Sequence, residues 1–151
     1  MGFLDSIDVS ASGLTAQRLR MDTIASNMAN VETTRVANGQ GPYRRKVVVF
    51  ESKEPLKNGN KFSNILQSKL MGLTGVRVKE IRELSDEEAP FRRVYEPSHH
   101  DADEQGYVNY PNVNVVEEMI NMISSTRAYE ANTKVIESTR NMAATALGIG
   151  R

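Results

Sequence analysis

The chain lacks cysteine and tryptophan, and only 6% of its 151 residues are aromatic. Without cysteine it has no disulfides, no thiolate metal ligands and no cysteine nucleophile. So few aromatic side chains predict that no large single hydrophobic core forms. The sequence also lacks an excess of charge, because 19 Lys and Arg balance 19 Asp and Glu. A neutral chain is not attracted in bulk to nucleic acid or to anionic membranes.

Several sequence signatures are missing as well. There is no G-x-S-x-G elbow, no P-loop and no G-x-G-x-x-G motif, and no stretch approaches the roughly 18 apolar residues of a membrane span. Asp5 and Asp8 stand where a secretory signal would carry Lys or Arg. We therefore expect no enzyme, no cofactor, no small-molecule substrate and no cleaved signal peptide. A cytosolic location is the default expectation unless a dedicated export machine recognises the unprocessed chain.

Two polar clusters need an interpretation. Residues 99–104 (HHDADE) carry metal-ligating side chains, but contiguous residues cannot easily surround one ion, and the EF-hand spacing fails at Gln105 and Asn112. We interpret this run as a solvated loop without a metal. The basic runs 44–46 and 92–93 fall in predicted strands, where neighbouring side chains point to opposite faces. They do not predict a single patch for nucleic acid.

Regular apolar spacing predicts a long helix at each end of the chain. In the first 30 residues the apolar steps alternate between three and four, and Gly13 interrupts them at a cost of about 1 kcal/mol. In the last third, Asn114 and Glu117 have the spacing of a capping box, and no Gly or Pro follows until Gly148. Gly148 suits the position just past a helix end.

The middle of the chain, about residues 31–111, has the composition of short strands joined by turns. Strands are predicted at Tyr43–Glu51, Gly75–Arg82 and Phe91–Glu96. In the second of them the alternation slips before Ile81, which predicts a bulge or a strand end. We therefore expect an α+β fold, in which residues 1–30 and 112–151 form a discontinuous helical assembly domain and residues 31–111 form a β-rich segment.

The predicted helices are too long and too broadly apolar to cover each other. About 33 helical residues span roughly 50 Å, whereas a compact chain of this size has a radius of gyration of about 15 Å. We expect the helices to pair as a coiled-coil-like antiparallel hairpin, with leftover apolar surface that binds other chains. The predicted assembly contacts are Leu4, Ile7, Leu14, Met21, Ile24, Met28, Val115, Met119, Ile120, Met122, Ile123, Tyr129, Ile136 and Leu147.

A more specific signal lies at the end of the first helix. The segment Ser26–Thr33, SNMANVET, resembles the S-N-x-A-N-x-x-T fingerprint of the axial proteins of the bacterial flagellum, which are the rod, hook and hook-associated proteins. Glu32 departs from this pattern, since relatives often have Asn or Asp there. Further segments resemble the proximal-rod members of that family: Gly41–Phe50, Tyr95–His99, Asp101–Asp103, Gly106–Val108 and Pro111–Met119. Ser124–Asn132, SSTRAYEAN, resembles the motif that the family shares in its C-terminal helix.

The resemblance implies a structural subunit of the proximal rod in the flagellar basal body. Such a subunit would polymerise through its terminal helices into the torque-transmitting shaft that crosses the periplasm, after type III export without a cleaved signal. The implied partners are further copies, other proximal and distal rod proteins, adaptor subunits at the MS ring and export gate, and the export apparatus. An alternative that the residues leave open is a cytosolic adaptor whose helix pair binds the helices of another protein.

The fingerprint also predicts a joint between the first helix and the middle segment, made by Asn27, Ala29, Asn30 and Thr33. Asparagine tolerates the left-handed helical conformation, and its side chain satisfies nearby backbone groups. We expect these residues to end the helix in that way and to turn the chain out of the helical layer.

Overall fold

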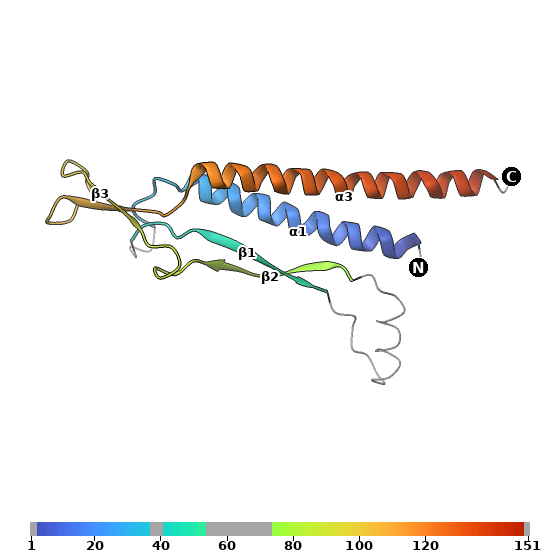
Figure 1. The fold of residues 1–151 in the computed structure, drawn as a ribbon, viewed down its shortest axis with the longest axis horizontal. Coiled ribbons are helices and arrows are strands. Elements are labelled where there is room, and N and C mark those ends of the chain that lie inside the picture. Colours follow the sequence, from blue (N-terminus) through green and yellow to red (C-terminus); the bar gives the residue numbers. More distant parts are fainter. Residues whose placement is uncertain (1–2, 37–40, 54–73, 150–151) are drawn as a thin grey trace, which may run out of the picture. The chain divides into compact units, whose positions relative to one another are not determined.

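A computed structural model describes residues 3–36, 41–53 and 74–149 of the chain. Among these residues a long helix lies near each end of the chain and four short strands lie between the helices in the sequence, which confirms the α+β class (Figure 1). The elements in chain order are α1 (Phe3–Ala29), β1 (Lys46–Ser52), β2 (Val76–Glu83), β3 (Arg92–Tyr95), β4 (Tyr107–Tyr110) and α3 (Val115–Ile149).

The start of α3 confirms the predicted N-cap. Asn114 Oδ1 accepts hydrogen bonds from the backbone N–H groups of Val116 at 3.0 Å and Glu117 at 3.4 Å. The prediction that Gly148 lies just past the helix end is wrong, because α3 continues to Ile149. In the described residues only Gly41 and Gly106 have positive φ, so Gly148 does not adopt the left-handed conformation of a helix-terminating glycine.

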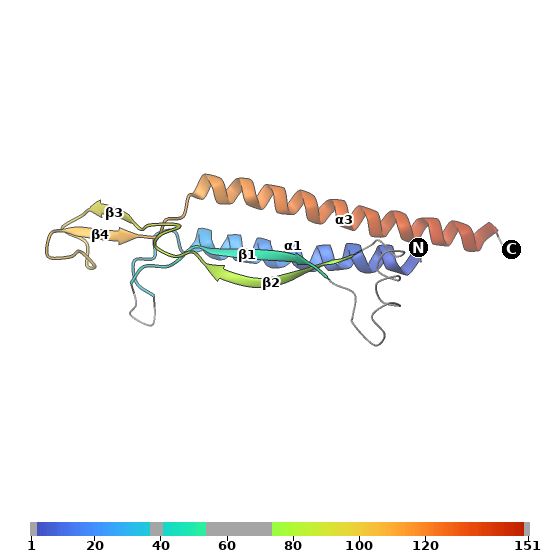
Figure 2. The same cartoon turned by 60° about the horizontal axis from the view of Figure 1, so that its bottom comes forward.

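Strands β1 and β2 form one two-stranded sheet (Figure 2). Lys53 N–H donates to Gly75 O at 2.7 Å, and Leu84 N–H donates to Arg45 O at 3.0 Å, so the strands are antiparallel. Between these two bonds β2 uses one residue more than β1, which is a β-bulge. Burial alternates from Val76 and stops after Lys79. Of the two outcomes that the slip before Ile81 left open, a strand end is excluded because β2 continues to Glu83, and the extra residue in β2 agrees with a bulge.

Strands β3 and β4 form a second antiparallel pair, in which Arg92 lies opposite Tyr110 and Val94 lies opposite Val108. β3 was predicted from the sequence, but β4 was not. With four residues, and with Asn109 among them, β4 is too short to show a clear alternation of apolar and polar side chains. Val108, which is 1% exposed, is its buried residue.

The chain divides into two compact units, and each contains part of α1 and part of α3. One unit comprises Met1–Leu19, Phe50–Lys79 and Ser125–Arg151, and the other comprises Arg20–Val49 and Glu80–Ser124.

Each unit contains a close contact between the two helices. In the first unit, a Cβ placed on Gly13 would lie 3.0 Å from Asn132 Nδ2. In the second, Asn27 Nδ2 donates to Glu118 Oε2 at 3.2 Å. Gly13, early in α1, lies near Asn132, whereas Asn27, late in α1, binds Glu118 near the start of α3. The two helices are therefore antiparallel. Gly13 is explained by this close approach to α3.

The buried part of the helix pair is mostly small or polar. Among the described residues the buried hydrophobic side chains are Ala16, Ile24, Tyr43, Val108 and Val113, which agrees with the expected absence of a large core. The buried polar side chains are Ser10, Thr23, Asn27, Glu118, Ser125 and Thr139. Because the α3 members recur at multiples of seven residues, they lie on one face of that helix. The apolar residues on its other faces are therefore left for other contacts.

Replacing Gly75 with Val is expected to destabilise the first unit. A Cβ on Gly75 would lie 2.7 Å from Ser12 Oγ, and that hydroxyl accepts from Val76 N–H at 3.0 Å and donates to Val9 O at 2.7 Å. We expect a loss of about 1–3 kcal/mol in the free energy of unfolding, measured by urea denaturation. Gly148→Ala is the control, because nothing lies within 4 Å of that position. It should be neutral or slightly stabilising, and equal effects of the two changes would contradict the contact with Ser12.

Candidate assembly site

Asn27 joins three parts of the second unit through its side chain. It lies in the last turns of α1 and is 1% exposed. Its Nδ2 donates to Lys46 O at 2.8 Å and to Glu118 Oε2 at 3.2 Å. Its Oδ1 accepts from Lys46 N–H at 2.9 Å and from the Tyr43 hydroxyl at 3.0 Å. All four hydrogen-bonding positions of the amide are therefore used, and the side chain binds the start of β1 as a neighbouring peptide group would.

Glu118 is the charged member of this network. Its side chain is 2% exposed and pairs with the Arg45 guanidinium, whose Nε lies 2.8 Å from Glu118 Oε1 and whose Nη2 also contacts that oxygen. Arg45 Nη2 reaches Glu117 Oε1 at 3.0 Å as well. Burial of the guanidinium opposes its charge, but the hydrogen bonds and charges of the two glutamates outweigh it and raise the pKa of Arg45. The residue just before β1 is thus joined to the first turn of α3 by a buried ion pair.

Asn30 and Thr33 close the end of α1 as a pair. Asn30 Nδ2 donates to Ser26 O at 2.9 Å, and Asn30 Oδ1 accepts from the Thr33 hydroxyl at 3.1 Å. The expected satisfaction of a helix carbonyl by asparagine is therefore present. The expected left-handed conformation is wrong, because no non-glycine residue in the described part has positive φ. The chain leaves α1 through ordinary turn bonds, with Thr33 N–H donating to Asn30 O at 3.2 Å.

Replacing Asn30 with Ala is expected to loosen this turn without unfolding α1. The change removes the bond to Ser26 O and the acceptor for Thr33, each worth about 1 kcal/mol. We expect a loss of about 1–2 kcal/mol in unfolding free energy and impaired assembly in the cell, measured by swimming in soft agar. Ala25→Ser, at an exposed position of α1 outside the joint, is the matched control. Full motility of an Asn27→Ala, Asn30→Ala double variant would contradict the joint.

The acidic end of the 99–104 run builds a turn. Asp103 Oδ1 accepts from Gln105 N–H at 2.9 Å and Tyr107 N–H at 2.8 Å, and its Oδ2 lies 2.6 Å from Arg93 Nη2. The bond from Tyr107, with help from Arg93, lowers the pKa of Asp103 from its ordinary 3.8. The contribution of this carboxylate to stability is therefore present above pH 3.8 and lost as the pH falls through the lowered value.

The other members of that run make local contacts too. Asp101 accepts from the Thr34 hydroxyl at 2.8 Å and lies 2.6 Å from Arg35 Nη2. His99 Nδ1 accepts from the Asp101 backbone N–H at 3.1 Å, so one ring nitrogen already has a structural partner. Within residues 3–36, 41–53 and 74–149, no three His, Cys, Asp or Glu side chains are placed to hold a metal ion.

The basic side chains 44–46 contact separate carboxylates, although β1 begins only at Lys46, so the prediction that Arg44 and Arg45 lie in a strand is wrong. Arg44 Nη1 lies 2.9 Å from Asp86 Oδ1, whereas Lys46 Nζ lies 3.5 Å from Glu83 Oε1. Arg45 between them points to α3 and Glu118. These three side chains therefore form no continuous cationic surface.

Two groups of exposed apolar residues remain on α3. We name the first the N-terminal patch: Val116, Met119, Ile120 and Ile123, which are 48–65% exposed. The second is the C-terminal patch: Met142, Leu147 and Ile149, which are 61–80% exposed. Val116, Met142 and Ile149 are not among the assembly contacts predicted from the sequence. The sequence shows that these residues are apolar. It does not show that they are exposed, because that depends on which face of α3 packs against α1.

The other predicted contacts differ in accessibility. Ile24 is 5% exposed and packs inside the chain, so it is not available to a neighbour. The side chain of Leu4 lies outside the described part of the structure. Most of the remaining predicted contacts are half-buried: Ile7, Leu14, Met21, Met28, Val115, Met122, Tyr129 and Ile136.

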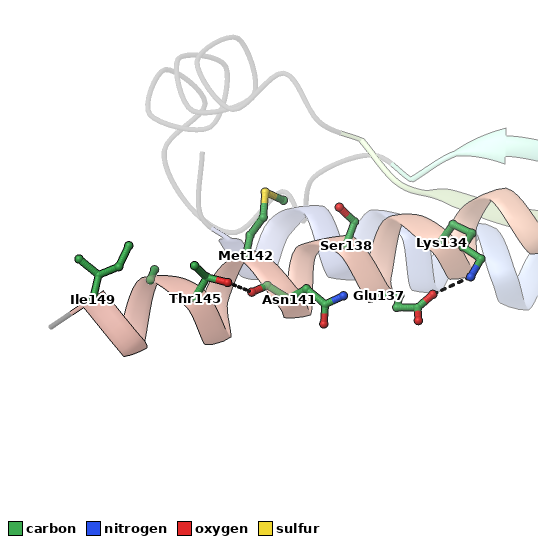
Figure 3. Close-up of a pocket in the computed structure, with 8 residues that line it drawn as sticks. Lys134, Glu137, Ser138, Asn141, Met142, Thr145 and Ile149 are labelled. Carbon is green, nitrogen blue, oxygen red and sulfur yellow. Dashed lines mark hydrogen bonds and ion pairs between the residues drawn. The ribbon is translucent and has the colours of Figure 1, made fainter. Parts of the chain in front are cut away.

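The C-terminal patch borders an open hollow on the last turns of α3 (Figure 3). Its lining includes Met142 and Ile149 together with an ion pair of Lys134 Nζ and Glu137 Oε2 at 2.9 Å. All lining residues belong to one helix. A hollow on one helix is a contact surface for another element rather than an enclosed substrate site. None of the described helices is both long and apolar enough to cross a membrane.

Comparison with known proteins agrees with this arrangement. A family model described as "Flagella basal body rod protein" matches residues 7–35, and one described as "Flagellar basal body rod FlgEFG protein C-terminal" matches residues 104–149. The flagellar basal-body rod protein FlgC of Bacillus subtilis is 45% identical over 97% of both chains. The FlgC proteins of Borreliella burgdorferi and of Escherichia coli O6:H1 are 44% and 38% identical over at least 98% of each chain.

Proposed function

This chain belongs to the family of flagellar basal-body rod proteins, and from that membership we propose that its two terminal helices are the surfaces through which it polymerises. It is a structural subunit of the rod in the flagellar basal body, and it contacts other basal-body components. Residues 1–30 and 112–151 form the assembly domain, and residues 31–111 form the segment attached to it.

The exposed N-terminal patch of α3 is the observation that carries this proposal. Its members Val116, Ile120 and Ile123 lie at helical spacing and are more than half exposed. The seam that α3 turns toward α1 is instead built from Glu118 and Ser125. Contiguous exposed apolar surface of this kind marks a protein–protein contact, and a helix that presents it fits a groove between neighbouring helices.

The partners are further copies of this chain and the adjoining proteins of the proximal and distal rod. Adaptor subunits at the MS ring and the export gate, and the export apparatus itself, are further partners. The apolar patches match such neighbours because packed helices supply complementary apolar ridges. Each fully buried large side chain adds about 1.5–3 kcal/mol, so a few of them suffice for a stiff assembly.

Electron cryotomography of the motor in cells that lack only this gene tests the proposal. We expect inner-membrane rings without rod, hook or filament, and recovery of all three with a plasmid copy. Normal rods in the deletion strain, with no second copy of the gene present, would overturn it. They would favour the alternative of an adaptor that binds helices of another protein inside the cell.

A further inference from the structure

Methionine supplies all the sulfur in this chain. The sequence contains seven methionines and no cysteine. Hydroperoxides oxidise the methionine thioether to a sulfoxide, and in a chain without thiols no cysteine competes for the oxidant. The structure describes the side chains of Met21, Met28, Met119, Met122 and Met142. Which of these reacts first is therefore decided by accessibility.

Met119 and Met142 are the most accessible methionines in the described part of the chain. Met119 is 48% exposed and Met142 is 61% exposed, whereas the other three are half-buried. Met122, on the same helix as Met119, lies four residues after the buried Glu118 and is therefore on the face that α3 turns toward α1. Met119 instead belongs to the N-terminal patch, whose other members are more than half exposed. An oxidant in solution therefore reaches Met119 more easily than Met122.

Oxidation would turn Met119 from an apolar into a polar member of the N-terminal patch. Val116, Ile120 and Ile123 carry only hydrocarbon side chains, so Met119 is the patch residue whose polarity a peroxide can change. The sulfoxide oxygen accepts hydrogen bonds, but hydrocarbon neighbours offer it no donor. Enclosing a polar group without a hydrogen bond costs free energy. The oxidised patch would therefore bind an apolar neighbour more weakly.

We propose that Met119 is a modification site for hydroperoxides, and that its oxidation keeps the free subunit out of the rod. The Met119 sulfur gives an electron pair to one peroxide oxygen, and the O–O bond breaks. The proton of the transferred oxygen passes to the leaving oxygen, which departs as water or an alcohol. Sulfur is oxidised by two electrons and the peroxide is reduced by two. Because this chain has no thiol, return to the thioether requires a dithiol on another molecule.

The inference rests on the proposed function, because it takes the N-terminal patch as an assembly contact. The same contact would protect Met119 after assembly, since a side chain enclosed by a neighbouring subunit is not accessible to peroxide. Oxidation would therefore act on subunits that have not yet assembled and would leave the finished rod unchanged.

The first test measures accessibility with hydrogen peroxide as the probe. The purified full-length subunit and isolated basal bodies are treated briefly, and tandem mass spectrometry of their peptides locates each added oxygen. In the free subunit Met119 should be oxidised several times faster than Met122, which is the matched reference on the same helix. In basal bodies Met119 should remain a thioether. Equal rates for the two methionines in the free subunit, or equal oxidation of Met119 in both samples, would overturn the inference.

The second test measures assembly without an oxidant. Met119→Gln places a polar group of similar length where the sulfoxide would be, and it should weaken association about tenfold and reduce swimming in soft agar. Met119→Leu keeps an apolar side chain that peroxide cannot oxidise, so it should swim better than Met119→Gln. Thr133→Gln, at an exposed position of α3 outside both patches, is the control and should swim normally. Circular dichroism of the purified variants should show the same helix content in all three.

The outcomes separate this inference from the proposed rod function. Equal swimming of Met119→Gln and Met119→Leu would overturn the inference, because polarity at this position would then have no effect on assembly. It would leave the rod function intact as long as the chain is present in isolated basal bodies. Absence of the chain from basal bodies of the natural strain would instead contradict the rod function, and the inference with it.

Discussion

Replacing Arg45 with Met is expected to lower the free energy of unfolding by about 3 kcal/mol. The change removes the cation from Glu118, whose side chain is 2% exposed and whose Oε1 lies 2.8 Å from Arg45 Nε. Asn27 Nδ2 still donates a hydrogen bond to the Glu118 carboxylate, but it carries no positive charge. A buried charge without its counter-ion is among the most destabilising changes available in a small domain.

The size of the effect is measured by urea unfolding of the purified subunit, followed by far-ultraviolet circular dichroism. Adding Glu118→Gln to Arg45→Met should recover much of the loss, because the neutral amide needs no counter-ion and its oxygen still accepts from Asn27. Lys134→Met is the matched control, since it breaks an ion pair with Glu137 on the exposed face of α3 and should have little effect.

The two results distinguish a buried ion pair from an ordinary surface contact. If Arg45→Met and Lys134→Met lowered the free energy of unfolding by the same small amount, the buried ion pair between Arg45 and Glu118 would be contradicted. If the double variant were no more stable than Arg45→Met, the loss would come from packing of the arginine stem rather than from the stranded carboxylate.

Replacing Ile120 and Ile123 together with Asp is expected to abolish rod assembly while the subunit stays folded. Both side chains are more than half exposed, so a polar residue there does not disturb the packing of the chain itself. In an assembled shaft the same positions would bury charge against apolar neighbours. Two such positions at about 1.5–3 kcal/mol each weaken association at least about a hundredfold.

Swimming in soft agar and cryotomography of basal bodies measure assembly, and circular dichroism of the purified variant measures folding. Thr133→Asp is the control, because it adds the same charge at an exposed polar position of α3 outside both patches and the hollow. We expect the control strain to swim normally and the double variant to lack rods. A swimming double variant would remove the N-terminal patch from the assembly surface and leave the family membership unaffected.

Local signals in the sequence accounted for the elements that are long or well capped. The spacing of apolar residues predicted both helices. Asn114 predicted where α3 begins, because its side chain accepts hydrogen bonds from backbone N–H groups only two and three residues away. The slip before Ile81 left a bulge or a strand end open, and the extra residue in β2 agrees with the bulge. The errors fell where local signals are weak: β4 has four residues, and Gly148 is tolerated within a helical turn.

The order of residues by itself determined the fold class, the family and the presence of apolar faces broader than one helix can cover. Only the tertiary structure decided which faces the helices use on each other. It showed that polar and small residues fill the seam, so that Val116, Ile120 and Ile123 remain outside. The sequence singled out Asn27 for bonds to nearby helix carbonyls, whereas its side chain binds Lys46 and Glu118, which is 91 positions away. Periodicity reports the conformation of a segment, whereas the partner of a side chain depends on where distant segments meet in space.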